Sequence, residues 1–397
     1  MIEYFKRKQF RLLKFINYDF IRKKYFDIIN SKERLIGIVG SRGIGKTYLF
    51  LQYLKKLPVD KALYISADDI IFTNSSIINI VEEFYTLNGR FLLIDEIHKY
   101  PNWAQEIKNI YDFYPDLIIR FTGSSMLNII KEQYDLSRRA VVFKMPILSF
   151  REYLHLKFNI ELPEFKLAQI LNNSIEISNN LVADHPHIYA EFKKYLKTGC
   201  YPFFSESEEF YNSKLINALM KVINEDVPSI KKIKYEHLYI FKKLIFKLIQ
   251  AKVPYKLNIS SLSNEFNITL PTMYNYLDIL EDTGIFRLIK KYSSKITKKP
   301  EKILFANPNI IYSFSEEYGI EPEIGTIREC FFVSNFNKIF YADNGNFIYN
   351  NVIFEIGGRK KRFNQIKDKG NSFLVIDTDI SVNKNKIPLW LFGFLKI

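Results

Sequence analysis

A glycine-rich segment with one lysine and one threonine is the clearest chemical feature of this 397-residue sequence. Residues 40–47 read GSRGIGKT and match the pattern G-x-x-x-x-G-K-[ST] in full. The glycines allow a tight turn in which backbone N–H groups converge on phosphate oxygens. The Lys46 ammonium can then reach the β and γ phosphates, and the Thr47 hydroxyl can ligate Mg²⁺ at the start of the next helix.

The segment therefore predicts a site for ATP together with Mg²⁺. The residues expected to contact the nucleotide are consecutive, and they are Gly40, Ser41, Arg42, Gly43, Ile44, Gly45, Lys46, Thr47 and Tyr48.

Two acids at the end of an apolar run can supply the other half of such a site. FLLID (91–95) is followed directly by Glu96. Asp95 stands where a buried strand is expected to end, and we expect it to hold the Mg²⁺ through water. Glu96 is expected to orient the attacking water and take its proton, because water must lose a proton as it attacks the γ-phosphorus. The alternative is an exposed pair that caps the next helix.

Two further polar positions are candidates for contact with the γ-phosphate. Ser124 and Ser125 follow the apolar run 117–123, and we expect a side chain there, Ser124 first, to lie between the Mg²⁺ acid and the phosphate. Arg138 and Arg139 come next, and a guanidinium at the γ-phosphate raises the hydrolysis rate by about 10³–10⁵. Arg139 is the expected catalytic residue. The alternatives are a turn or helix cap for the serines and a surface ion pair for the arginines.

Short apolar runs alternate with helical stretches in the first part of the chain. Such runs are typical of parallel strands buried on both faces, so the pattern predicts an α/β fold with right-handed βαβ crossovers. The expected strands are 35–40, 62–66, 91–95, 117–123 and 141–145. We divide the chain into a helical lead-in (1–34), the nucleotide-binding sheet (35–148), a helical lid (149–232), a winged helix (233–315) and an α/β domain (316–397).

These segments resemble those of bacterial and archaeal AAA-type ATPases that carry a C-terminal DUF4143 or archaeal-ATPase-like domain. The resemblance runs from about residue 35 to 205, in GSRGIGKT, LLIDEIHKYPNWAQEIKNIYD, FTGSS, LSRR with PILSFREYL, and TGCYPFF. It implies a P-loop NTPase fold of the ASCE type.

The resemblance also implies roles for individual residues. It makes Asp95 the Mg²⁺ acid and Glu96 the catalytic base, and it places His98 beside them. The family arginine follows a Ser-Gly pair, and this chain has Arg138 at the glycine position. The choice between Arg138 and Arg139, and between action within one subunit and across subunits, therefore stays open.

The segment 259–285 predicts a helix–turn–helix in which Thr269 caps the second helix and Pro271 lies in its first turn. The segment 287–302 follows with seven bases and one acid. Together they are typical of a winged helix with a basic wing that contacts DNA phosphates. Packing against a protein is the alternative.

The last domain resembles a PD-(D/E)XK-nuclease-like fold. Glu329 and Glu355 match its acidic positions, but Asn346 stands where an Asp is expected and Gly357 where a Lys is expected. Because carboxylates are needed to hold the catalytic cation, we expect a degenerate domain without nuclease activity. The basic run 359–362 can still contact nucleic acid.

Composition narrows the class of protein. Lys and Arg number 57 against 43 Asp and Glu, a net charge of +14, which favours phosphate-rich partners or reflects a Lys-rich composition. Cys200 and Cys330 lie too far apart in sequence for a CxxC pattern, so neither a disulfide scaffold nor a cysteine zinc site organises the chain. The N-terminus lacks a signal-peptide core, and no apolar run reaches the roughly 18 residues of a membrane span, so we expect a cytoplasmic protein with no membrane contact.

These features predict Mg²⁺-dependent ATP hydrolysis coupled to a C-terminal module that binds nucleic acid. The alternative is a slow nucleotide-dependent switch or scaffold that binds a protein partner, with little hydrolysis and no DNA contact. The sequence favours no particular oligomeric state.

Overall fold

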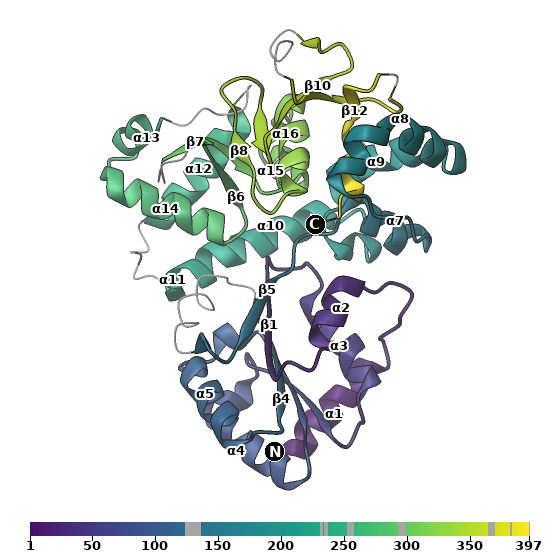
Figure 1. Cartoon of the computed structure of the whole chain (residues 1–397). Coiled ribbons are helices and arrows are strands. Elements are labelled where there is room, and N and C mark those ends of the chain that lie inside the picture. The colour runs from purple at the N-terminus through teal and green to yellow at the C-terminus, as the bar shows by residue number, and fades with distance from the viewer. Residues whose placement is uncertain are drawn as a thin grey trace. The chain divides into compact units, whose positions relative to one another are not determined.

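The computed structural model describes residues 1–123, 136–230, 233, 237–251, 258–292, 299–363, 370–381 and 383–396. The chain forms two compact units, Met1–Ile147 and Leu148–Ile397, and each is described by itself (Figure 1). Among the described residues, no helix combines the length and the apolar character needed to cross a membrane. The finer five-part division stays a prediction.

A parallel five-stranded sheet organises the first unit. Its strands are β1 (Leu35–Val39), β2 (Ala62–Ser66), β3 (Phe91–Asp95), β4 (Ile118–Gly123) and β5 (Val141–Lys144). They lie in the order β2-β3-β4-β1-β5, and every neighbouring pair is parallel. The predicted parallel α/β sheet is therefore confirmed. Strand β4 lies between β1, which leads into the glycine-rich loop, and β3, which ends at Asp95.

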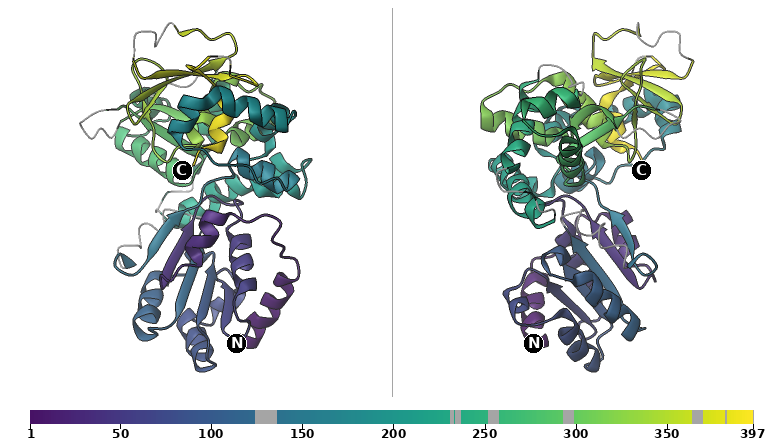
Figure 2. Two further views of the ribbon diagram at one scale, coloured as in Figure 1. Left: turned by 45° about the vertical axis from the view of Figure 1, so that its right-hand side comes forward. Right: turned by 90° about the vertical axis from the view of Figure 1, so that its left-hand side faces the viewer.

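Helices cover both faces of this sheet (Figures 1 and 2). They are α1 (Ile2–Leu13), α2 (Lys23–Ile29), α3 (Lys46–Lys56), α4 (Ile77–Thr86) and α5 (Trp103–Phe113), with short 3₁₀ turns at Ile70–Thr73 and Ile97–Lys99. The apolar residues of α4 recur at helical spacing and are buried against the sheet, and the Ser76 hydroxyl caps the helix by accepting from the Asn79 N–H.

Helix α1 covers the edge strand β2. The Gln9 side-chain amide donates to the Ala62 carbonyl (3.4 Å) and accepts from the Tyr64 N–H (3.0 Å), and the Lys6 ammonium donates to the same Ala62 carbonyl (2.7 Å). These side chains continue the hydrogen-bonding ladder on the side of β2 that faces away from β3. An edge capped in this way is protected from pairing with another chain.

The second unit contains helices, a hairpin and a mixed sheet. Its helices are α7 (Phe150–Phe158), α8 (Leu167–Asp184), α9 (Ile188–Thr198), α10 (Tyr211–Lys221), α11 (Val227–Ile230), α12 (Leu238–Gln250), α13 (Ile259–Glu265), α14 (Leu270–Asp282), α15 (Pro308–Tyr318) and α16 (Ile324–Ser334). A π-helical turn (Val222–Asp226) joins α10 to α11, and 3₁₀ turns span Pro202–Ser205 and Leu389–Phe394.

The hairpin pairs β6 (Phe286–Lys290) with β7 (Pro300–Phe305) in antiparallel fashion. The mixed sheet has the order β12-β11-β10-β9-β8, from β8 (Phe340–Tyr341), β9 (Phe347–Tyr349), β10 (Val352–Gly358), β11 (Ser372–Asp377) and β12 (Lys386–Pro388). Strands β10, β11 and β12 are parallel, and β9 and β8 continue the sheet in antiparallel fashion.

Local sequence signals explain the start of α14 and the packing of the second unit. The Thr269 hydroxyl accepts from the Thr272 N–H, and Pro271 lies in the first turn, as expected. Buried aromatic rings fill the core: Phe150 lies 5.4 Å from Phe192 and 5.8 Å from Phe394, centroid to centroid. Such edge-to-face pairs add to the free energy gained from burying their area.

A buried arginine fixes the sheet of the first unit to the end of α2. Arg120, on β4, is fully buried. Its guanidinium donates to the carbonyls of Ile29 (2.6 Å), Ser31 (2.9 Å) and Ile119 (2.9 Å). Burial lowers the pKa of Arg120, so these carbonyl dipoles must compensate for the loss of water around its charge.

We expect Arg120→Met to lower the free energy of unfolding of the first unit by about 3 kcal/mol, because buried carbonyls lose their donors. Urea denaturation of the full chain measures the effect. The control is Arg7→Met, since the Arg7 side chain is 73% exposed and pairs with Glu3 on the surface of α1. An Arg120→Met midpoint equal to that of the control would contradict this account of the buried guanidinium.

Candidate functional site

The glycine-rich loop joins β1 to α3 and has the backbone geometry that its sequence requires. Gly43 (φ 83°) and Gly45 (φ 91°) are left-handed, a region that side chains disfavour. At Gly40 a Cβ atom would lie 2.4 Å from the Met145 carbonyl oxygen, so only glycine fits there. The tight turn of the loop therefore depends on its glycines.

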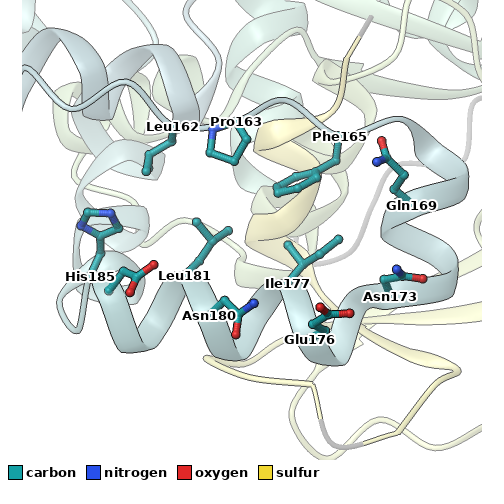
Figure 3. A pocket seen from close by; sticks show the side chains of 11 residues that line it. Leu162, Pro163, Phe165, Gln169, Asn173, Glu176, Ile177, Asn180, Leu181 and His185 are labelled. Carbon is teal, nitrogen blue, oxygen red and sulfur yellow. The ribbon is translucent and has the colours of Figure 1, made fainter.

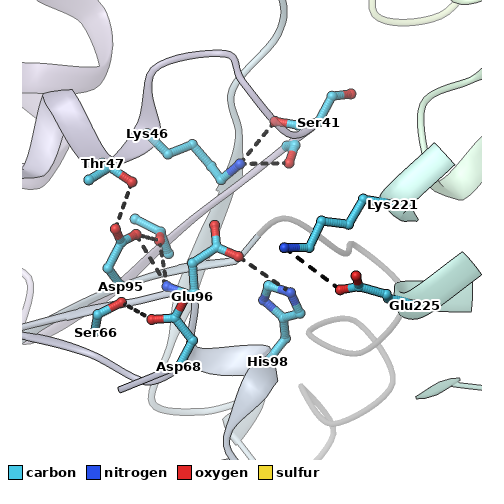
Figure 4. Close-up of polar contacts among 12 residues, drawn as sticks. Ser41, Lys46, Thr47, Ser66, Asp68, Asp95, Glu96, His98, Lys221 and Glu225 are labelled. Carbon is cyan, nitrogen blue, oxygen red and sulfur yellow. Dashed lines mark hydrogen bonds and ion pairs between the residues drawn. The ribbon is translucent and has the colours of Figure 1, made fainter. Parts of the chain in front are cut away.

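The Lys46 side chain lies across this loop (Figure 4). It is 5% exposed, and its ammonium donates to the carbonyls of Gly40 (3.0 Å) and Ser41 (2.9 Å). Two other predicted contact residues point elsewhere. Ile44 is buried, which leaves only its backbone for a phosphate, and the Tyr48 hydroxyl donates to the Asn17 side chain (2.8 Å).

Asp95 is the centre of a buried hydroxyl network at the end of β3. Its carboxylate accepts from the hydroxyls of Thr47 (2.6 Å), Tyr64 (2.8 Å) and Thr122. Asp95 is 3% exposed. The structure thus brings together Thr47 and Asp95, which the sequence proposed as the two Mg²⁺ residues.

Tyr64 and Thr122 were not predicted. Tyr64 lies on β2 and Thr122 on β4, the two strands that flank β3 in the sheet. Burial, followed by the charge of Asp95, raises the pKa of Tyr64, so its hydroxyl stays protonated and can donate. The sequence alone could not connect these two side chains with Asp95, because the connection depends on the strand order. The sequence signal that could have suggested it is a polar residue near the end of each flanking strand.

Glu96 adopts a left-handed backbone conformation (φ 51°, ψ 39°), which is uncommon for a residue other than glycine. Its N–H donates to the Thr122 hydroxyl (3.1 Å) and to the Asp95 carboxylate (3.2 Å), and these bonds hold the turn. The Glu96 side chain makes no helix-capping hydrogen bond. Instead one carboxylate oxygen lies 3.5 Å from Nε2 of the buried His98 (Figure 4).

Backbone strain of this kind gathers at functional sites, where the surrounding contacts hold it in place. The left-handed turn directs the Glu96 carboxylate away from Asp95 while its N–H remains bonded to Asp95. The two adjacent acids therefore have different surroundings, Asp95 among hydroxyls and Glu96 beside His98.

The arginines predicted to contact the γ-phosphate are not seen at this site. Arg139 forms a two-pronged ion pair with Asp112 of α5 (Nε–Oδ1 2.8 Å, Nη2–Oδ2 2.9 Å), which is the surface pairing considered as the alternative. Arg138 is exposed. Ser124 and Ser125 fall outside the described residues. A role for Arg139 or Ser124 at the γ-phosphate stays a prediction.

The positions matched to a nuclease lie close together in the second unit. Glu329 forms a buried ion pair with Lys302 and accepts from the Asn346 side-chain amide (2.9 Å). Glu355 pairs with Lys361 (2.6 Å). The two acids are thus each neutralised by a lysine, and within the described residues no group of three or more His, Cys, Asp or Glu is arranged to hold a metal ion.

A cavity of about 370 Å³ lies between α8 and the segment 162–165 (Figure 3). Phe165, Ile177 and Leu181 provide apolar lining, and amide and carboxylate side chains of α8 line the rest. No residue predicted from the sequence to take part in catalysis lines this cavity.

Family models match two segments of the chain. Residues 32–154 match an AAA domain, and residues 189–316 match DUF8612, a domain of unknown function. The resemblance to DUF4143 is therefore not supported, since a different domain model matches the C-terminal half.

Two curated relatives come from Methanocaldococcus jannaschii. The uncharacterized protein MJ1637 is 32% identical over 310 residues, covering 73% of this chain and 64% of the relative. The uncharacterized protein MJ1544 is 26% identical over 350 residues, covering 83% of this chain and 73% of the relative. The chain thus spans slightly less than two thirds of MJ1637.

Solved structures show distant similarity. AMPPCP-bound DnaA from Aquifex aeolicus has a TM-score of 0.27 at 15% identity, over 66% of this chain and 85% of that chain. A katanin structure has a TM-score of 0.25 at 15% identity (40% and 57%), and C. elegans PCH-2 has 0.24 at 19% identity (45% and 46%). The AAA match, the glycine-rich loop and the sheet order β2-β3-β4-β1-β5 together support an AAA-type P-loop domain in the N-terminal unit.

Proposed function

We propose that the N-terminal unit binds ATP with Mg²⁺ and hydrolyses it. The observation that carries the proposal is the 2.6 Å contact between the Thr47 hydroxyl and the Asp95 carboxylate. It joins two residues that are 48 positions apart in sequence and places them beside the loop that Lys46 spans. A hydroxyl and a carboxylate are hard oxygen ligands of the kind that Mg²⁺ prefers.

In this mechanism Thr47 would hold the cation directly and Asp95 would hold it through water. When bound, Mg²⁺ neutralises charge on the β and γ phosphate oxygens. The backbone N–H groups of residues 40–47 bind the phosphates, and the Lys46 ammonium exchanges its carbonyl acceptors for phosphate oxygens. Glu96 orients the attacking water and takes its proton at a carboxylate oxygen.

The hydroxyls of Tyr64 and Thr122 position Asp95. Each donates a hydrogen bond to the carboxylate, so together they fix its direction. Nε2 of His98, whose side chain is 2% exposed, lies 3.5 Å from the Glu96 carboxylate and helps to orient it. Such supporting contacts decide how well a metal-binding acid is oriented.

The second unit is proposed to couple this ATPase to nucleic acid. Helices α13 and α14 followed by the β6–β7 hairpin have the element order of a winged helix, and α16 with the mixed sheet supports the nuclease-like assignment. Asn346 and the lysine-paired acids argue against nuclease activity in this domain. We retain the helical lid (149–232) as part of the proposal.

The first test replaces the two residues with the most distinct roles. Lys46→Ala should remove measurable ATP binding, because the only ammonium on the loop is lost. Glu96→Gln should bind ATP normally but lower its turnover at least about 100-fold, because a general base is worth 10²–10⁴ in rate. Isothermal titration with ATP and phosphate-release assays give the two readouts.

Wild-type turnover by Glu96→Gln would show that the base is a different residue. ATP binding by the wild type with negligible turnover, both with and without DNA, would favour the nucleotide-dependent switch. Failure of the wild type to bind ATP would refute the proposed function.

The second test concerns the hydroxyl network. Tyr64→Phe should raise the Mg²⁺ concentration for half-maximal turnover about tenfold, because one hydrogen bond to an ionised group is worth about 1.5 kcal/mol. Tyr100→Phe is the matched control, since it removes a tyrosine hydroxyl that donates to Glu106 (2.7 Å) and not to Asp95. An equal Mg²⁺ dependence in the two variants would remove Tyr64 from the site.

A further inference from the structure

A polar cluster in the second unit lies at the carboxyl ends of two parallel strands. Gly358 and Asp377 are the last residues of β10 and β11 and pair with each other in the sheet. The Asp377 carboxylate accepts from the Tyr189 hydroxyl (2.9 Å), the Arg328 Nε (3.0 Å) and the Lys193 ammonium. Ligands of open α/β sheets commonly bind at this end of the strands.

Asp377 orients the Arg328 side chain by accepting a hydrogen bond from its Nε atom. Asp377 is 5% exposed at its side chain, and Arg328 is 22% exposed. Within the described residues, the two terminal nitrogens of the Arg328 guanidinium make no hydrogen bond. A Cβ atom at Gly358 would lie 3.3 Å from one of them, so the guanidinium rests against the end of β10. Four N–H hydrogens on one fixed plane are left for an acceptor.

Two lysines of α9 lie near this cluster. Lys193 and Lys197 lie one turn apart on α9, and the Lys193 side chain is 41% exposed while it pairs with Asp377. The Lys197 ammonium lies 6.0 Å from the ring centroid of Tyr312. Asp377 and Asp379 are the acids of the cluster.

Electrostatic effects show that these groups act on one another. Burial raises the pKa of Tyr312 and the charge of Asp377 adds to the rise, so this ring faces the same cluster. Burial alone would raise the pKa of Asp377, but the hydrogen bonds from Lys193, Arg328 and Tyr189 outweigh it and lower the pKa. Asp377 therefore remains ionised and keeps Arg328 in place.

The basic run that follows β10 extends this charge. Arg359 and Lys360 are exposed and directly follow Gly358, and the run continues through Arg362 without an acid. Burial alone would raise the pKa of Asp379, but hydrogen bonds from the Thr378 hydroxyl and from backbone N–H groups outweigh it, and the charge of Arg359 adds to the lowering. The Arg328 guanidinium and the basic residues 359–362 thus form an extended region of positive charge.

We propose that Arg328, Lys193 and Arg359 form a phosphate-binding site and that its ligand is the backbone of nucleic acid. A planar guanidinium with free terminal nitrogens suits two phosphate oxygens. The extension of the bases along 359–362 fits a chain of phosphates better than a single anion. The inference rests on the nucleic-acid part of the proposed function and is independent of the ATP site.

The test measures binding of the full chain to a labelled random-sequence DNA duplex at several salt concentrations, by fluorescence anisotropy. Arg328→Gln and Arg359→Gln should each weaken binding about fivefold to tenfold and reduce the slope of log K against log salt by about 1. Arg359 is exposed, so this variant folds normally and should retain wild-type ATP turnover.

Lys384→Gln is the matched control. It removes the same charge from an exposed residue just before β12, at the amino ends of the parallel strands, and should bind DNA within about twofold of the wild type. An equal loss in the control would mean that only net charge matters, and this would overturn the assignment.

The remaining outcomes separate the sources of the phosphate. If both arginine variants bind DNA as tightly as the wild type, the proposed site is wrong. DNA would then bind at the β6–β7 hairpin or at another surface. No DNA binding by the wild type, with ATP turnover intact, would overturn both this inference and the nucleic-acid part of the proposed function. AMP that binds as tightly as the duplex and depends on Arg328 would assign the site to a small phosphate instead.

Discussion

The first unit depends on supplying hydrogen-bond donors to one buried carboxylate, Asp95, at the end of β3. A buried carboxylate without hydrogen-bond donors would destabilise the fold, so donors must come from several directions. These donors are hydroxyls from β2, β4 and the start of α3. Thr122, on β4, accepts from the N–H of Glu96 and donates to the Asp95 carboxylate, so β4 fixes the positions of both acids.

In the second unit, lysine ammonium groups are the partners of the buried carboxylates. Glu329 and Glu355 each pair with a lysine, and Asn346 links Glu329 to the backbone of β10 by accepting from the Ile356 N–H (2.6 Å). An amide can both donate and accept, so Asn346 joins two elements where an aspartate would repel Glu329. Burial raises the pKa of Glu329, and the charge and hydrogen bond of Lys302 oppose that rise. This pairing stabilises the cluster without a cation.

The strands and the glycine-rich loop were predictable because their signals are local. Apolar runs fix where strands lie, and the loop follows from the spacing of Gly40, Gly45 and Lys46. Strand order is not local, so Tyr64 and Thr122 could not be connected to Asp95 before the sheet was known. Arg139 was assigned to the γ-phosphate by resemblance. Its ion pair with Asp112 of α5 could not be predicted, because the two residues are 27 positions apart in sequence. The left-handed conformation of Glu96 had no signal either, because the adjacent Asp95 and Thr122 impose it through its N–H.

The contacts of α1 have a consequence for where the ATP-binding unit begins. The AAA match starts at residue 32, yet Lys6 and Gln9 bond the backbone of β2, the strand that also carries Tyr64. A segment cut at the family boundary would leave that backbone open to other chains and would loosen β2, whose Tyr64 hydroxyl donates to Asp95. The family match and the folded unit therefore have different boundaries: helix α1 lies outside the match but inside the folded unit.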